Sequence, residues 1–383
     1  MERQSLTRTG KLLRELIALP SVNPAFLPPG NPYAGEQRVV EFLAAQARRA
    51  GLDVEFQPVE PRRANLVARM SPRGQVRQRV LLAPHLDTVG GNEVPGALFT
   101  PRVTQGRLYG RGACDTKGSV AAMFLALAET ARSGRRPRQT ELVFAGLVGE
   151  ECGQDGSRAL ASSGFQADLA IVGEPTGLQV VTAHKGDLWL TLRTRGRAAH
   201  GARPELGRNA VHEMARVVDV LETEYATRLR RRRHPLLGHA TINVGTIRGG
   251  RQPNIVPDEC VISIDRRTLP GESDRQVKSA ILSFLRSKGL RARITATETR
   301  PCLALDTDAG LPLVQHLLGA VQQKQPAGVD YFSDAGVLGA AGIPSVLFGP
   351  GDIAQAHTAD EWISLGELER SKEFLLRFLR SLP

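Results

Sequence analysis

Apolar runs of strand length alternate with longer amphipathic segments along the first half of the chain. The strand-like runs include "RVLLAP", "ELVFAGLV" and "ADLAIVG", and apolar residues recur at helical spacing in 35–50 and 118–134. This alternation is typical of a mainly parallel sheet with helices on both faces. Such sheets bind ligands at the carboxyl ends of their strands. We therefore expect a doubly wound α/β domain whose functional residues lie just beyond strand ends.

The pattern changes near residue 185. Strands with one exposed face are predicted where apolar and polar residues alternate, in "DLWLTLRTRGRAA", "ATINVGTIRGG" and "DECVISIDRRTL". Helical spacing marks 209–229 and 274–289 between and after them. Towards the C-terminus, the alternation of apolar strand-like runs and helical segments returns. We predict a catalytic domain made of 1–184 and 299–383, with an α+β domain inserted at 185–298.

Composition indicates the cellular compartment in which the protein is expected. The chain has 383 residues, of which 41% are hydrophobic, enough for two domains. The N-terminus mixes charges into its apolar residues, unlike a secretory signal, and no run approaches the length of a membrane span. The four cysteines are scattered and form no CxxC motif: Cys114, Cys152, Cys260 and Cys302. We interpret Cys114 and Cys152, which lie beside Asp115 and Glu151, as small buried residues. A cytoplasmic protein with no membrane partner is expected.

A formal net charge of +11 raises the question of nucleic-acid binding. Five arginines fall within "RLRRRRH" at 228–234. The run ends a helical pattern and precedes a loop, and no aromatic residues are interleaved with it. We interpret it as a solvated basic loop and expect no nucleic-acid partner. Retention on DNA at physiological salt would be needed to revive that hypothesis.

Polar residues with metal-binding chemistry follow the predicted strands. They are His85 and Asp87 in "PHLDTV", Asp115 in "GACDTKG", Glu150 and Glu151 in "GEECG", Glu174 in "VGEPTG", and His357 in "GPGDIAQAHTADE". Adjacent carboxylates such as the Glu150–Glu151 pair repel each other and resist burial, so most such pairs are simply solvated. A parallel sheet, however, would gather all of these strand ends at one edge.

Two histidines and several carboxylates suit zinc, with cobalt or manganese as substitutes. The carboxylates are too many for one four-coordinate ion. Two ions about 3.5–4 Å apart that share a bridging carboxylate would accommodate them. One glutamate of the pair would then be a ligand and its neighbour a general base.

Seven motifs, in this order, resemble a known family. They are "PHLDTV", "GRGACDTKG", "GEECG", "VGEPTG", "RAAHGARPELGRNA", "PNIVPDECVISIDRR" and "GPGDIAQAHTADE". Each is weak alone, but the ordered series covers nearly the whole chain and is specific. The chain is similar to zinc-dependent aminoacylases, acetylornithine deacetylases and succinyl-diaminopimelate desuccinylases, a family that includes glutamate-releasing carboxypeptidases.

The resemblance implies a ligand set and a base. His85, Asp115 and Glu174 would hold one zinc, and Asp115, Glu151 and His357 the other, with Asp115 bridging. Glu150 would move the proton, Asp87 would orient the His85 ring, and a cis peptide would follow Asp115.

The resemblance also assigns the inserted domain as a lid that forms a homodimer. His200 would reach the partner's active site and stabilise the oxyanion, while Asn254 and Arg267 would grip the substrate's carboxylate. The remaining histidines are interpreted as structural or solvent-facing: His184, His212, His234, His239 and His316.

The implied activity is removal of an acyl group from a small N-acyl amino acid. "YFSDAG" at 331–336 is closer to desuccinylases than to enterobacterial deacetylases, so the acyl group stays open. The alternatives are a carboxypeptidase or dipeptidase on the same scaffold and a non-catalytic small-molecule-binding protein.

Overall fold

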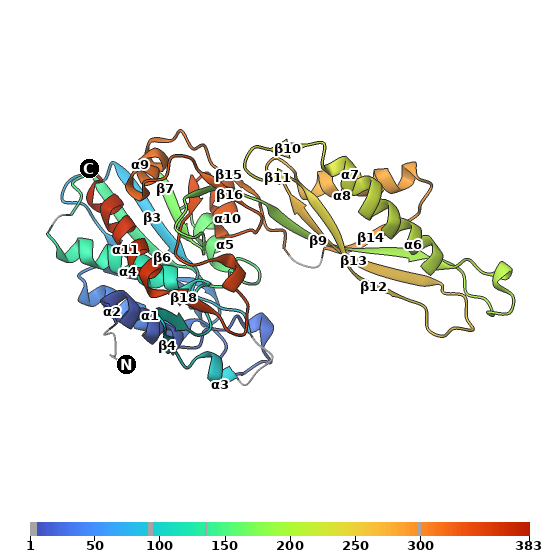
Figure 1. The fold of residues 1–383 in the computed structure, drawn as a ribbon, viewed down its shortest axis with the longest axis horizontal. Coiled ribbons are helices and arrows are strands. Elements are labelled where there is room, and N and C mark those ends of the chain that lie inside the picture. The colour runs from blue at the N-terminus through green and yellow to red at the C-terminus, as the bar shows by residue number, and fades with distance from the viewer. Residues whose placement is uncertain (1–5, 91–94, 135, 298–299) are drawn as a thin grey trace. The chain divides into compact units, whose positions relative to one another are not determined.

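The chain folds into two compact units in a computed structural model that describes residues 6–90, 95–134, 136–297 and 300–383 (Figure 1). The first unit comprises Met1–Thr182, Thr307–Ala327 and Ser333–Pro383. The second comprises Ala183–Asp306 and Gly328–Phe332. The predicted boundary between 298 and 299 lies outside the described residues.

A mixed sheet forms the centre of the first unit. Its four middle strands are parallel neighbours: β6 (Thr140–Gly146), β3 (Gln78–Pro84), β7 (Leu169–Gly173) and β17 (Ser345–Leu347). Antiparallel strands β2 (Arg63–Met70) and β1 (Asp53–Glu60) extend it beyond β6. On the other side of β17 the order continues through β8 (Val181–His184) to β15 (Leu305–Asp306), with β16 (Ala327–Val329) beside β8. The chain divides into its two units within β8 and β16, and β15 is assigned to the second unit. The predicted α/β class is confirmed.

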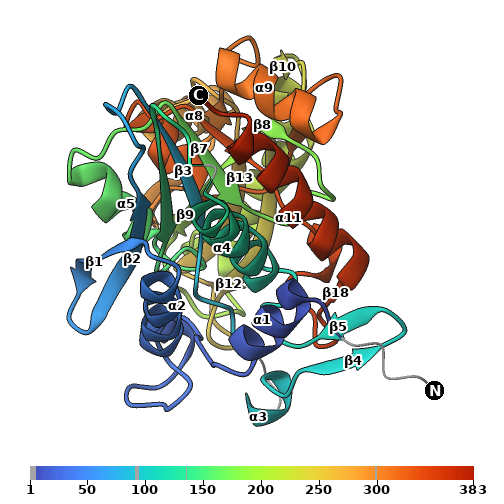
Figure 2. The same ribbon diagram turned by 90° about the vertical axis from the view of Figure 1, so that its left-hand side faces the viewer.

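Helices cover both faces of this sheet. On one face α4 (Lys117–Arg132), which is buried along nearly its whole length, packs on β3 and β6 between α1 (Arg8–Ile17) and α11 (Leu365–Arg380) (Figure 2). The same apolar core includes α2 (Gln37–Arg49) and α9 (Pro312–Val321). On the other face α5 (Asp155–Ser162) packs against α10 (Asp334–Ala340). An all-round apolar helix such as α4 needs burial on every side, which this arrangement provides.

Short elements that the sequence did not reveal complete the first unit. β4 (Arg102–Thr104), β5 (Arg107–Tyr109) and β18 (Trp362–Ser364) form a separate three-stranded sheet, and α3 (Pro95–Leu98) is a single turn. Three residues are too few to display a period-two pattern. β18 nevertheless ties the C-terminal part of the chain to β5, which matters for the candidate site.

The second unit is an antiparallel sheet covered by helices. Its strand order is β12 (Thr241–Gly249), β13 (Glu259–Thr268), β9 (Gly186–Arg195) and β14 (Arg293–Thr297). Burial alternates strictly along β13, as expected for a sheet with one covered face. That face packs against α6 (Ala210–Val220), α7 (Ala226–Leu229) and α8 (Asp274–Ser287). A small hairpin is formed by β10 (Arg233–His234) and β11 (Gly238–His239).

Among the described residues, no helix combines the length and the apolar character that a membrane span needs.

Candidate functional site

The parallel strands deliver the predicted residues to one edge of the sheet. His85 directly follows β3, Glu174 directly follows β7, and Glu150 and Glu151 lie in the turn after β6. These strands run in the same direction, so their carboxyl ends meet. The buried runs that predicted the strands therefore also explain why the polar residues converge.

Two loops supply the other candidates. The aspartate loop (residues 110–116) leads from β5 into α4 and carries Asp115, and the peptide bond from Asp115 to Thr116 is cis, as the resemblance implied. The histidine loop (residues 351–361) precedes β18 and carries His357, whose φ of 62° lies in the left-handed region. A non-glycine residue there is strained and must be held by its surroundings.

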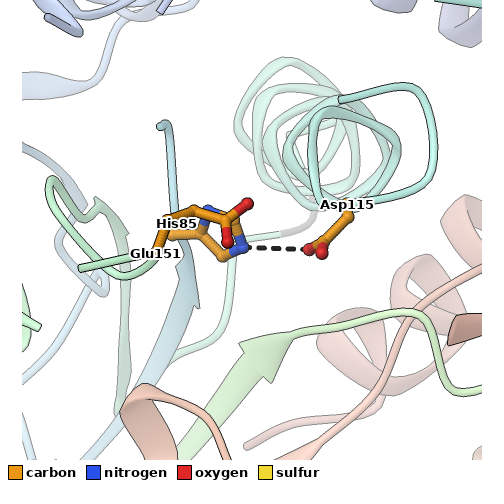
Figure 3. Close-up of side chains that lie close together, drawn as sticks. All are labelled: His85, Asp115 and Glu151. Atoms are coloured by element: carbon orange, nitrogen blue, oxygen red, sulfur yellow. Dashed lines mark hydrogen bonds and ion pairs between the residues drawn. The ribbon is translucent and has the colours of Figure 1, made fainter. Parts of the chain in front are cut away.

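Asp115 lies between the two histidines. Its Oδ1 is 3.1 Å from His85 Nε2, and its Oδ2 is 3.4 Å from His357 Nε2. Glu151 Oε2 is 3.0 Å from the same His357 nitrogen. His85, Asp115 and Glu151 (Figure 3) each offer one ligand atom, and these atoms all lie within 4.8 Å of one another.

The His85 ring is oriented by a backbone carbonyl. Its Nδ1 lies 3.1 Å from the carbonyl oxygen of Asp87, which can only accept a hydrogen bond. Nδ1 therefore carries a proton, and Nε2 faces Asp115. Burial opposes the charged form of this ring, but the carboxylates of Asp115 and Asp87 outweigh it and raise the pKa of His85 well above its usual value.

Asp87 connects His85 with the glutamate pair. Its Oδ1 is 3.5 Å from His85 Nδ1 and accepts a hydrogen bond from the Glu150 amide at 3.0 Å. Its Oδ2 accepts from the Glu151 amide at 3.1 Å and from Asn23 Nδ2 at 2.8 Å. This fully buried carboxylate thus fixes the backbone that carries both glutamates.

The two glutamates differ in their surroundings. The Glu151 carboxylate contacts His357, whereas Glu150 donates from its backbone amide to Asp87. Burial raises the pKa of Glu150 well above its usual value, although the charge of His85 opposes the shift. Burial and the charge of Asp115 raise the pKa of Glu151 to about 7. The pair therefore offers one carboxylate next to a histidine and one apart from it.

The donor set fits a divalent cation. Buried carboxylate oxygens without a hydrogen-bond partner occur on Glu151, Glu174 and Asp334. Two ligands that each lie about 2.0–2.1 Å from a tetrahedral zinc are roughly 3.3 Å apart, close to the spacings around Asp115. Imidazole nitrogens and carboxylate oxygens are the atoms that such an ion prefers. These residues therefore form a candidate metal centre.

Sequence reasoning missed three buried residues at this centre. Glu361 accepts hydrogen bonds from the aspartate loop, Asp334 accepts one from Ser157 Oγ, and Asn23 donates to Asp87. Glu361 stands four residues after His357 in the same motif, and Asp334 belongs to "YFSDAG". The sequence alone could therefore have indicated both residues. Nothing in the sequence around Asn23 signals its contact with a residue so far along the chain.

His200 and Asn254 lie in the second unit, on adjoining segments. The amide of Gly201 donates to the Asn254 carbonyl at 2.7 Å, and His200 forms an antiparallel bridge with Ile255. The His200 ring is exposed, and its Nδ1 accepts a hydrogen bond from the Ala202 amide at 3.1 Å. The proton of the neutral ring is therefore on Nε2, which is free to donate.

Arg267, also in the second unit, already has carboxylate partners. Its Nε and Nη2 donate to the two oxygens of Asp265, both at 3.0 Å. Nη2 also lies 3.5 Å from Asp187, a buried residue whose Oδ1 has no hydrogen-bond partner. One edge of the guanidinium is therefore filled within the second unit.

Known proteins are similar to this chain in sequence and in fold. The chain matches Peptidase family M20/M25/M40 over residues 81–381. It is 30% identical to an acetylornithine deacetylase of Myxococcus xanthus over 355 residues, covering 88% of this chain and 90% of that protein. The structure of an M20 family metallo-carboxypeptidase from Sulfolobus solfataricus matches it with a TM-score of 0.78 at 18% identity, covering 98% of this chain and 99% of that one.

A dinuclear metal-binding peptidase of the M20 family from Bacillus subtilis has the same fold, with a TM-score of 0.71 at 12% identity over 97% of each chain. The family match covers most of the chain and includes the strand ends and loops that build the candidate metal centre. The protein is therefore a hydrolase that belongs to peptidase family M20/M25/M40.

Proposed function

We propose that the protein is a dinuclear zinc amidohydrolase that removes an acyl group from the nitrogen of an N-acyl amino acid. The observation that carries the proposal is the position of Asp115, whose two carboxylate oxygens face different histidines. A carboxylate in this position suits a bridging ligand. The similarity to an acetylornithine deacetylase favours acyl-group removal, and acetyl and succinyl groups are the candidates.

The proposed ligands divide into two sets that share Asp115. His85 and Glu174 complete one set, and Glu151 and His357 complete the other. Bound divalent ions would act as Lewis acids that polarise the scissile carbonyl and make water a stronger nucleophile. Cobalt or manganese would suit the same oxygen and nitrogen donors.

Glu150 is the proposed proton carrier. It is buried beside Glu151 and does not contact His357 in the described structure. With divalent ions bound nearby, its carboxylate would be ionised and would accept a proton from the attacking water. The same carboxyl group then delivers that proton to the leaving nitrogen. Asp87 assists by holding the backbone amides of both glutamates, which keeps the base beside the ligand set.

The second unit would contribute from a partner subunit. We propose that it forms a homodimer and that His200 donates from Nε2 to the oxyanion of the tetrahedral intermediate. The contact between its Nδ1 and the Ala202 amide supports this role because it leaves Nε2 as the donor. Asn254 and Arg267 are the proposed contacts for the free carboxylate of the substrate.

A carboxypeptidase or dipeptidase is the second candidate. The solved metallo-carboxypeptidase with this fold favours it, since amide hydrolysis of an acyl amino acid and of a peptide needs the same metal centre and base. The alternative of a non-catalytic binding protein is wrong, because the chain belongs to a family of hydrolases. No nucleic-acid or membrane partner forms part of the proposal.

We predict that a hydrolysis screen will separate these candidates. The purified protein should cleave N-acetyl or N-succinyl amino acids faster than dipeptides. Amidation of the substrate's free carboxylate should lower kcat/KM, because Arg267 and Asn254 would lose their partner. Equal cleavage of free acids and amides would contradict the proposed carboxylate contact, and faster cleavage of dipeptides would favour the peptidase.

Metal content gives a second prediction. Elemental analysis of the purified protein should find two divalent ions per chain, and dialysis against a chelator should abolish hydrolysis. Adding zinc or cobalt back should restore it. Full activity in a preparation that contains no divalent metal would rule out the proposed centre.

The two adjacent glutamates should behave differently when each loses its charge. Glu150→Gln should keep both ions while kcat falls by roughly 10²–10⁴-fold, the usual contribution of a general base. Glu151→Gln should instead weaken the binding of one ion, because a ligand is lost. Metal titrations and kinetics on both variants test this assignment, and reversed phenotypes would show that the roles are exchanged.

Subunit mixing tests whether His200 acts across a dimer. His200→Ala should lose about 10²–10³-fold in kcat and keep its metals, since one oxyanion donor is removed. When it is mixed with inactive Glu150→Gln and the subunits exchange, half of the dimers contain one intact site. Activity should recover to roughly a quarter of wild type. Verified mixed dimers that stay inactive would place His200 outside the partner's site.

A further inference from the structure

One buried carboxylate joins the two loops of the candidate metal centre. Glu361, at the end of the histidine loop, is 2% exposed and accepts four hydrogen bonds from the aspartate loop. The donors are the amides of Gly112 at 2.8 Å, Cys114 at 2.9 Å and Asp115 at 3.0 Å, and Nη1 of Arg111 at 3.1 Å. Both carboxylate oxygens are used, two donors on each. The amide of the proposed bridging residue itself is one of the four.

Further contacts fasten the same two loops. Arg111 Nη1 also donates to the carbonyl oxygen of Thr358, the residue after His357, at 3.1 Å. The amide of Gly110 donates to the backbone carbonyl of Glu361 at 3.0 Å. Directly beyond these contacts, β18 pairs with β5, so the strand that follows one loop is bonded to the strand that precedes the other. The two loops therefore form one cross-linked assembly.

His357 depends on this assembly more than His85 does. The side chain of His357 is 56% exposed, and its backbone has the left-handed φ described above. Little burial and a strained backbone mean that the anchored residues on either side must hold it. His85, in contrast, directly follows β3 and is 2% exposed within the sheet. Loosening the histidine loop would therefore move one histidine and leave the other in place.

We propose that Glu361 is a positioning residue that fixes His357 relative to Asp115 and so determines the affinity of the metal set containing His357. The inference rests on the proposed dinuclear centre. Glu361 would not contact either ion, since its oxygens are taken up by the aspartate loop. Its effect on the ions is exerted through backbone amides, whose loss of a buried acceptor is costly.

Titration of the metal-free protein with Co²⁺ alone tests the proposal. Wild type should bind two ions. Glu361→Gln replaces one acceptor oxygen with an NH₂ group that faces N–H donors, so it should bind the ion of the set containing His357 about 10–100-fold more weakly, the usual effect of removing a partner of a metal ligand. The other ion shares Asp115 but keeps His85 in place, so it should lose less affinity. Glu141→Gln is the matched control, because Glu141 is another buried glutamate paired with an arginine, Arg79, at the far end of β6. It should bind both ions normally.

Hydrogen exchange in the metal-free protein gives an independent readout. Amides in peptides covering 110–117 should exchange faster in Glu361→Gln than in wild type or Glu141→Gln. If Glu361→Gln does not fold, Glu361→Asp keeps both oxygens but falls short by roughly 1.5 Å, one carbon–carbon bond, and should show a smaller loss of the same ion.

The outcomes separate this inference from the proposed function. Wild type that binds fewer than two ions would refute the dinuclear centre, while the exchange experiment would still test the role of Glu361 in the loops. Wild type with two ions and a folded Glu361 variant that binds both equally well would overturn the inference alone. Equal loss of both ions in a folded variant would also overturn it, because the effect would not be specific to the set containing His357.

Discussion

The candidate site depends on one kind of interaction, the pairing of backbone amides with buried carboxylates. Three consecutive amides show it most clearly, because Gly149 donates to Glu36 while Glu150 and Glu151 donate to the two oxygens of Asp87. Glu36 is itself paired with Arg63 at 2.6 Å. Buried amides must find acceptors, and a buried charge must find donors. Each group meets the other's requirement, and the turn that carries the glutamate pair becomes rigid.

The need to compensate buried charge also explains how so many acidic side chains can share one edge of the sheet. Burial raises the pKa of Glu150 and Glu174 well above the usual value, which shows how strongly this environment disfavours uncompensated charge. Asp115 and Asp87 are exceptions. His357 and His85 overcome burial at Asp115, His85 and Asn23 do so at Asp87, and both pKa values lie below the usual value. Carboxylates that are buried without such a cation need one from elsewhere. Divalent ions would supply it, so the electrostatic cost of the cluster is itself an argument for a metal centre.

The sequence was sufficient to place the site residues that lie at the ends of periodic elements. Apolar runs marked β3, β6 and β7, and the sheet then required His85, the Glu150–Glu151 pair and Glu174 to converge. Partners held by irregular loops were not predictable in this way. The contact of Asn23 with Asp87 joins residues distant in the chain and has no local signature. Glu361 lies in the same motif as His357, but that motif does not show that Glu361 accepts a hydrogen bond from the Asp115 amide. The short strands β5 and β18 bring Glu361 and Asp115 together. These strands were missed because three residues are too few to display a periodic pattern.

Arg267 shows how neighbours can change the meaning of a residue that the sequence singles out. A guanidinium grips a carboxylate best through two parallel hydrogen bonds. Asp265, two residues earlier on the same strand, already forms that paired contact, and Asp187 stands beside it. The other edge, formed by Nη1 and the second N–H of Nη2, is open to a substrate carboxylate but lies close to Asp187. The two acidic residues outnumber the one arginine, so this part of the second unit is less attractive to anions than Arg267 alone suggests. Specificity for a carboxylate would then require the additional donor that Asn254 offers.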